Sequence, residues 1–320
     1  MNRLTLLAAA AIMLAGCTPT TAYRTDSGEI WTTSYNITYE SASDLSDSIL
    51  AVLNEVDRSL SPFNPDSRIS AINAGSSTET DSLLRRMIRV STEVNGMSGG
   101  LFDPTVAPLV NLWGFGYRKA RELPDSAAVA DALGLVGISR CSLTGDTLIK
   151  GHPQMEFNFS AIAKGFACDL VGEMLRRNGV ENFLVEIGGE IVAAGINSRG
   201  EQWHVQIDAP QPGNGHKRLT VIPLTDCALA TSGNYRNYRQ ADSLTVWHTI
   251  NPLTGYPAVT HTLSATVRAS DCALADALAT ACMAMSADSA LSMIAAVPGA
   301  ACLLVVESAD SMAVVTSPNF

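Results

Sequence analysis

Apolar residues recur at helical spacing in several stretches of the chain. Between residues 44 and 60 they return every third or fourth position, which is the period of an amphipathic helix. The apolar positions of that stretch are Leu45, Ile49, Val52, Leu53, Val56 and Leu60. Similar patterns predict further helices over residues 81–95, 125–133, 162–178 and 271–285.

Other stretches are typical of strands. Residues 203–208 alternate between apolar and polar, as a strand with one buried face does, and residues 31–39 are rich in β-branched and aromatic side chains. Strands are also expected over residues 147–150, 183–187, 302–306 and 312–315, and residues 211–216 should form a loop. Because there is no regular β-α-β alternation, we predict an α+β fold with mixed sheets and packed helices. It would form one catalytic unit, with a division into two subdomains left open.

The N-terminus has the pattern of an export signal. Arg3 precedes an apolar run that is too short to span a membrane and fits the core of a signal peptide. The run ends in Leu14-Ala15-Gly16-Cys17, which resembles the lipobox of bacterial lipoproteins. A buried apolar helix is the alternative, but the polar residues that follow are typical of a tether.

This interpretation divides the chain into three parts. Residues 1–16 would be a lipoprotein signal peptide, residues 17–29 a tether, and residues 30–320 the catalytic domain. Cys17 would be the lipidation site. We therefore expect an exported protein, lipid-anchored to a bacterial membrane and facing the periplasm.

Composition and charge exclude some classes of function. The 320 residues are 47% hydrophobic and 16% charged, with a formal net charge of −10, and no run of lysine or arginine exceeds two. A chain of this kind lacks the basic footprint of nucleic-acid binding. Seven cysteines occur, six of them after Cys17, without a Cys-x-x-Cys pair or a zinc-like spacing. Export permits disulfides, but most of the six lie among alanine and leucine, so we expect buried free thiols.

Some familiar catalytic motifs fail in their context. Gly96-Met-Ser98-Gly-Gly100 matches the Gly-x-Ser-x-Gly pattern, but a helix precedes the serine where a serine hydrolase needs a strand. Neither the Gly-x-Gly-x-x-Gly dinucleotide fingerprint nor a P-loop is present. A serine hydrolase, a Rossmann enzyme and a P-loop enzyme are therefore not favoured.

Other segments offer groups suited to a phosphate, a metal or an aromatic ring. They are GLFDPTVAPLVNLWGFG from Gly100, NFSAIAKG from Asn158, VEIGGE from Val185, ATSGNYRNY from Ala230 and HTINPLTGYP from His248. In the helix ALADALATA, Asp276 and Thr280 stand one turn apart on one face, so both could reach one hard cation. Taken alone, that pair is more often solvent-facing or bonded to the backbone.

Together and in this order, these segments resemble the ApbE family of FAD:protein FMN transferases, over about Trp31 to Thr316. The resemblance implies an exported enzyme that uses Mg²⁺ to move FMN from FAD onto a threonine hydroxyl of an acceptor protein, with release of AMP. Subunits of membrane redox complexes would be examples of such acceptors. The alternatives are a Mg²⁺-dependent FAD pyrophosphatase and a non-catalytic periplasmic flavin-binding lipoprotein. The retained Asp276, Thr280 and Lys164 argue against mere storage.

The resemblance also implies roles for individual residues. Ala161, through its carbonyl, would bind Mg²⁺ together with Asp276 and Thr280, and His248 or Asp276 would accept the threonine proton. The FAD-binding residues would be Trp31, Phe63, Leu101, Phe102, Asp103, Asn158, Lys164, Gly188, Gly189, Glu190, Thr231, Ser232, Gly233, His248 and Thr249. Lys164 would face the pyrophosphate. The chain departs from the family at Trp31, Phe63, Asn158 and Asn251, where other residues are common.

Overall fold

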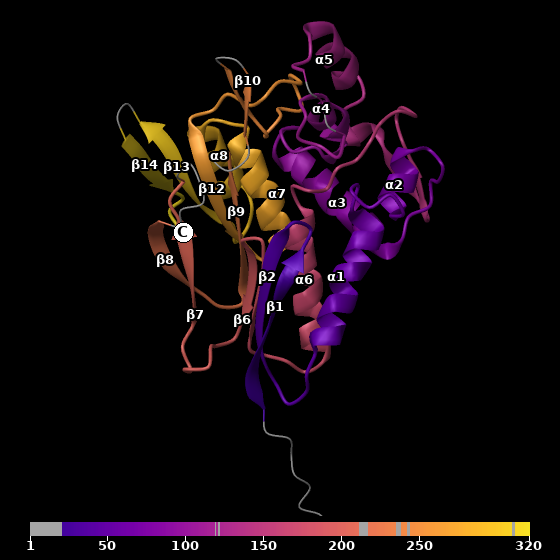
Figure 1. The fold of residues 1–320 in the computed structure, drawn as a ribbon. Coiled ribbons are helices and arrows are strands. Elements are labelled where there is room, and N and C mark those ends of the chain that lie inside the picture. The colour runs from indigo at the N-terminus through magenta and orange to yellow at the C-terminus, as the bar shows by residue number, and fades with distance from the viewer. Residues whose placement is uncertain are drawn as a thin grey trace, which may run out of the picture.

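An eight-stranded antiparallel sheet runs through the computed structural model, in the order β1-β2-β5-β6-β9-β12-β13-β14 (Figure 1). The structure describes residues 21–118, 120, 122–210, 217–234, 238–241, 244–308 and 311–320. The strands of the sheet are β1 Ala22–Ile30, β2 Thr33–Ser41, β5 Phe183–Ile187, β6 Glu190–Ala194, β9 Cys227–Gly233, β12 Thr262–Ala269, β13 Ala301–Ser308 and β14 Ser311–Thr316.

Helices cover one face of this sheet, with α6 and α7 packed directly against its central strands (Figure 1). The helices are α1 Ser46–Leu60, α2 Arg68–Asn73, α3 Ser82–Met97, α4 Ala107–Leu112, α5 Ser126–Leu133, α6 Ala163–Arg177, α7 Cys272–Met283 and α8 Ala287–Ala295. Helix α7 is buried along almost its whole length, because its many alanines let neighbouring elements approach closely on every side. Helices α6 and α7 therefore form the centre of the main hydrophobic core.

A two-stranded ribbon packs on the opposite face. It consists of β7 Trp203–Asp208 and β8 Arg218–Leu224, and its apolar side chains meet those of β6 and β9 in a second core cluster. The indole N–H of Trp203 donates to the carbonyl of Ala194 at 2.8 Å and joins the ribbon to β6. Two further hairpins, β3 Ser142–Thr144 with β4 Thr147–Ile149 and β10 Tyr238–Ala241 with β11 Leu244–Trp247, lie outside the main sheet.

The α+β prediction is confirmed, and the longer predicted helices form within about two residues of their expected ends. The expected loop over residues 211–216 lies outside the described residues. The strand expected over residues 31–39 begins two residues later, at Thr33, because Trp31 and Thr32 form the turn into β2 with φ angles of 50° and 63°.

The tether expected over residues 17–29 is wrong in its second part. Ala22–Ile30 forms strand β1, which pairs with β2 along its full length. A strand at the edge of a sheet can carry polar side chains on its open side, so the polar sequence of this stretch concealed it. The folded part of the chain thus begins no later than Ala22.

The cysteine prediction is confirmed for the described part of the chain. Cys168, Cys272, Cys282 and Cys302 are buried free thiols, and Cys141 and Cys227 are free and partly exposed. Burial raises the pKa of the Cys168 and Cys272 thiols. Among the described helices, none has the length and apolar character that crossing a membrane requires.

Candidate active site

Helices α6 and α7 cross at very short distance near the start of each. A Cβ atom on Gly165 would lie 2.3 Å from the carbonyl oxygen of Cys272, so only glycine fits at this crossing. One turn further along α6, the Asp169 carboxylate accepts hydrogen bonds from the backbone N–H groups of Cys272 and Ala273, at 2.8 and 2.9 Å. Burial raises the pKa of Asp169 to about 7, against the opposing effect of these two hydrogen bonds. The crossing sets the register of the two helices that carry the predicted metal-binding residues.

A cluster of three charged side chains lies at this crossing. The ammonium of Lys164 stands 3.1 Å from a carboxylate oxygen of Glu190 and 3.8 Å from Asp276 Oδ2. Both carboxylates are buried, and Asp276 Oδ2 also accepts a hydrogen bond from the N–H of Gly165 at 3.1 Å. Burial lowers the pKa of Lys164, but the adjacent charges of Asp276 and Glu190 outweigh it and hold that pKa above its ordinary value. Lys164 is therefore a fixed cation.

The residues predicted to bind a metal come together beside this cluster. The hydroxyl of Thr280 lies 3.5 Å from the carbonyl oxygen of Ala161 and 3.2 Å from the hydroxyl of Ser232. Asp276 stands one turn earlier on the same face of α7. No group of three or more His, Cys, Asp or Glu that could hold a metal exists in the described residues. Carboxylate, hydroxyl and carbonyl oxygens are the donors that Mg²⁺ prefers, so this donor set fits a hard cation.

A glycine turn between β5 and β6 borders the cluster. Gly188, with φ +65°, donates its N–H to the carbonyl of Ser34, and a Cβ atom there would meet Thr33 and the Lys164 side chain. The neighbouring Gly189 is exposed, with open space where a Cβ would be. The Lys164 side chain thus lies against one side of the turn, and on the other side the exposed Gly189 donates its N–H to Glu186 Oε1 at 2.7 Å.

The segment from Leu101 to Asp103 is fixed mainly by its own polar groups. The buried Asp103 carboxylate accepts hydrogen bonds from the backbone of Thr105 and Ile138, at 2.8 and 2.9 Å, and from the Thr105 hydroxyl. Phe102 is buried in the main core, whereas Leu101 is partly exposed. Asp103 and Phe102 therefore position this segment, and Leu101 is the member whose side chain reaches the surface.

Asn158 stabilises the turn that carries Ala161. Its side-chain oxygen accepts from the N–H and the hydroxyl of Ser160, and its own N–H donates to the carbonyl of Pro104. These contacts link the segment after Asp103 to the turn before α6. Asn158 thus stabilises the predicted metal-binding turn through hydrogen bonds that a neutral amide can make.

Two aromatic residues predicted to contact FAD lie near α1. Trp31 is partly buried and donates its indole N–H to Asp57 Oδ1 at 3.1 Å. Phe63 is 61% exposed, and its ring stands edge-on to Tyr117, with 6.1 Å between ring centroids. An exposed ring with an aromatic neighbour is available for stacking.

Sequence reasoning missed a polar group beside Phe63. The Tyr117 hydroxyl donates to Glu156 Oε2 at 2.7 Å, and Arg118 forms an ion pair with the same carboxylate. Burial, together with Glu156, raises the pKa of Tyr117 to about 12. The position of Tyr117 directly after the LWGFG motif was the available signal.

The remaining predicted residues lie at the end of β9 and in the loop after β11. Thr231 shares a 2.9 Å hydrogen bond with Thr266 of β12, and Gly233 ends β9. The Thr249 hydroxyl donates to the side chain of Asn234 at 2.6 Å, so the loop is tied to the end of β9. The ring of the neighbouring His248 stands edge-on to Phe115, at 6.3 Å between centroids.

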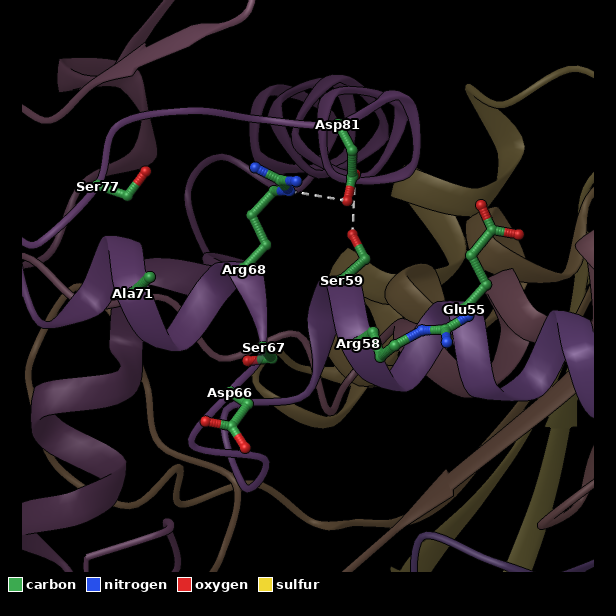
Figure 2. Close-up of a pocket in the computed structure, with 9 residues that line it drawn as sticks. All are labelled: Glu55, Arg58, Ser59, Asp66, Ser67, Arg68, Ala71, Ser77 and Asp81. Atoms are coloured by element: carbon green, nitrogen blue, oxygen red, sulfur yellow. Dashed lines mark hydrogen bonds and ion pairs between the residues drawn. The ribbon is translucent and has the colours of Figure 1, made fainter.

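A separate polar depression of about 450 Å³ lies between α1, α2 and the start of α3 (Figure 2). Figure 2 shows Arg68 and Ser59 directed at the Asp81 carboxylate, at 3.1 and 2.9 Å. None of the sequence-predicted site residues lines it. The Arg68 and Asp81 side chains at its centre form an ion pair with each other, so this depression is not the candidate site.

Comparison with known proteins agrees with the fold. A family model described as ApbE family matches residues 31–304. An FAD:protein FMN transferase of Vibrio cholerae is 36% identical over 287 residues, which cover 87% of this chain and 86% of the relative. The solved structure of flavin transferase ApbE from Vibrio cholerae matches with a TM-score of 0.84 and 33% identity, covering 94% of this chain and 98% of that one. The apo flavinyl transferase ApbE of Pseudomonas stutzeri gives 0.84 and 29%, covering 94% and 96%.

These matches define an α+β transferase. The chain belongs to the ApbE family, as the resemblance in its sequence implied.

Proposed function

We propose that the chain transfers FMN from FAD to a threonine hydroxyl of an acceptor protein and releases AMP, with Mg²⁺ as the metal. The observation that carries the proposal is the meeting of Lys164, Asp276, Thr280 and the Ala161 carbonyl at one crossing of helices. A diphosphate needs a fixed cation and a hard metal beside it, and this cluster supplies the first and the oxygen donors for the second. The names of the relatives given above support the same activity.

The residues of the cluster would bind different parts of the substrate and the metal. Ala161, Asp276 and Thr280 would hold Mg²⁺, which when bound would neutralise charge on the diphosphate oxygens. Lys164 would bind the diphosphate through its ammonium, which Glu190 and Asp276 hold in place. The exposed Phe63 ring and the exposed Gly189 would contact the organic parts of FAD.

The transfer exchanges one phosphorus–oxygen bond for another. The acceptor oxygen forms a bond to the FMN phosphorus, while the bond between that phosphorus and the bridging oxygen breaks and AMP leaves. We assign the proton of the acceptor hydroxyl to a ring nitrogen of His248, because Asp276 is assigned to the metal and already accepts from Gly165.

We also propose that the enzyme works at a bacterial membrane on the periplasmic side, held by lipid on Cys17. The support is the sequence of residues 1–17, with one early cation, a short apolar run and the lipobox-like end.

The test of the activity uses FAD, Mg²⁺ and the purified apo form of a redox-complex subunit that carries FMN on threonine. We expect Mg²⁺-dependent flavin fluorescence on the denatured acceptor and an equal amount of AMP. An acceptor with alanine in place of that threonine should gain no flavin. Free FMN and AMP, with no flavin on the protein, would instead support the pyrophosphatase.

A further inference from the structure

Glu190 is a buried carboxylate that the proposed function does not place on either FAD or the metal. It begins β6 directly after the Gly188-Gly189 turn, and its side chain is only 2% exposed. Within the part of the chain that the structure describes, its Oε2 accepts no hydrogen bond, and its charged partner is the Lys164 ammonium, 3.1 Å away. Burying an ionised carboxylate costs free energy unless it is paired and hydrogen-bonded. We therefore expect Glu190 to have a role other than packing.

Lys164 stands between two carboxylates, and it is closer to Glu190 than to Asp276. The distances are 3.1 Å to Glu190 and 3.8 Å to Asp276 Oδ2. Burial raises the pKa of Glu190, and the adjacent Lys164 ammonium opposes that rise and favours the ionised form. With Glu190 ionised, one cation between two anions leaves the cluster with one negative charge. If Glu190 were neutral, the same ammonium would face Asp276 alone, and that pair would have no net charge. A cation approaching Asp276 would then meet a site already neutralised by Lys164.

We propose that Glu190 is a positioning residue that holds the Lys164 ammonium and so keeps the charge of Asp276 available for the cation. The inference rests on the proposed function, because the cation is the Mg²⁺ assigned there to Ala161, Asp276 and Thr280. Glu190 itself is not a ligand in this scheme. It acts through Lys164, whose side chain passes close to Gly188, where an added Cβ would lie 3.2 Å from Lys164 Cδ.

This role differs from that of an ordinary structural ion pair in one measurable way. A structural pair stabilises the fold and leaves metal affinity unchanged when an isosteric amide replaces the acid. In the proposed arrangement Glu190 affects the metal affinity only through Lys164. Removing Glu190 weakens the affinity, removing Lys164 strengthens it, and removing Glu190 has no further effect once Lys164 is absent.

The experiment measures binding of Mn²⁺, which prefers the same oxygen ligands as Mg²⁺, by electron paramagnetic resonance on the protein without FAD. We expect Glu190→Gln to weaken Mn²⁺ binding about 10- to 100-fold, as loss of a supporting partner of a metal ligand typically does. Lys164→Met should bind Mn²⁺ more tightly than wild type. The double variant should bind Mn²⁺ as tightly as Lys164→Met, whereas simple addition of charges would return it only to the wild-type affinity.

Two controls separate the explanations. Glu181→Gln removes one negative charge from an exposed position before β5 and should leave Mn²⁺ affinity unchanged. The Lys164→Met variant leaves Glu190 intact, so it tests the charge relation even where Glu190→Gln does not fold. Wild-type affinity in a folded Glu190→Gln protein, or no tightening in Lys164→Met, would overturn the inference alone. Absence of Mn²⁺ binding in wild type would overturn both the inference and the metal assignment of the proposed function.

Discussion

Asp169 of α6 accepts a hydrogen bond from the backbone N–H of Cys272, the first residue of α7, at 2.8 Å. The carboxylate therefore takes the place of a cap at the N-terminus of α7, although it comes from another helix. Asp271, which directly precedes α7 in sequence, makes no such hydrogen bond. The contact joins the helix that carries Lys164 to the helix that carries Asp276, so the geometry of the site depends on it.

Replacing Asp169 by alanine should destabilise the protein. The change leaves two buried N–H groups of α7 without an acceptor, which costs about 1–3 kcal/mol. Asp271→Ala is the matched control and should cost less than about 1 kcal/mol, because its exposed carboxylate accepts from the exposed Ser270 hydroxyl and otherwise acts through the helix dipole. Urea unfolding measures both. Equal losses in the two variants would contradict the assignment of the cap to Asp169.

The helix crossing predicts a difference between two glycines of α6. Gly165→Ala would place a Cβ 2.3 Å from the backbone carbonyl of Cys272, which cannot move aside as a side chain can. Overpacking of this kind costs about 1–3 kcal/mol, and it should lower activity by displacing Asp276. Gly172→Ala, with its nearest contact to Phe183 at 3.3 Å, should be nearly neutral. Thermal unfolding measures the stability of both variants, and AMP release measures their activity. Wild-type stability and activity in Gly165→Ala would contradict the close helix crossing.

The proposed metal ligands should differ in importance. Asp276→Asn removes the only charge among them and should lower the rate on the order of 10²–10³-fold. Thr280→Val should cost less, since water can replace a neutral ligand, and Ala161→Gly should be mild because the carbonyl remains. The measurement is Mg²⁺-dependent AMP release from FAD with acceptor present. Wild-type activity and metal dependence in Asp276→Asn would refute this metal site.

The thiols should separate into two groups. Under native conditions a thiol reagent at pH 8 should modify Cys141 and Cys227, while Cys168 and Cys272 react only after denaturation. Burial raises the pKa of these buried thiols in the fold, so the unfolded chain loses its thiol protons first as pH rises. Stability should therefore fall as pH increases above about 8.5, the pKa of a free thiol. Mass spectrometry of the labelled protein checks the first expectation and unfolding at several pH values the second.

The proposed lipid anchor depends on one residue. Cells that carry Cys17→Ser should release the enzyme from the membrane fraction, because acyl chains contribute about 0.8 kcal/mol for each buried methylene. Ser27→Ala, in the exposed edge strand β1, is a control that should stay with the membrane. A Cys17→Ser enzyme retained as tightly as wild type would exclude this anchor.

The sequence predicts the helices of this fold better than its sheet. Helices α1, α3, α6 and α7 show their period because each has a buried face or, in α7, an Ala-rich stretch that continues throughout. Strand β1 was missed because an exposed edge strand needs no apolar alternation. The six residues of α2 are too few to show a helical period, and its cap at Ser67 is the only local signal.

The candidate site divides in the same way. Asp276 and Thr280 are close in sequence, so their common face follows from helical geometry alone. The contact between Lys164 and Glu190 joins α6 to β6, and no local pattern indicates which side chain of the turn points inward. The same holds for Asp169, whose partner lies over a hundred residues away. Interactions of this kind arise from packing, so only the folded chain reveals them.

If the proposed lipid on Cys17 is present, the early start of β1 limits the distance between the enzyme and the membrane. With lipid on Cys17, only a few residues separate the anchor from Ala22, where β1 begins. Fully extended, the segment from Cys17 to Ala22 spans about 17 Å. A tether that continued to residue 29 would have spanned about 45 Å. The catalytic domain would then lie close to the bilayer surface. Its natural acceptors should therefore carry the modified threonine within a short distance of the lipid headgroups.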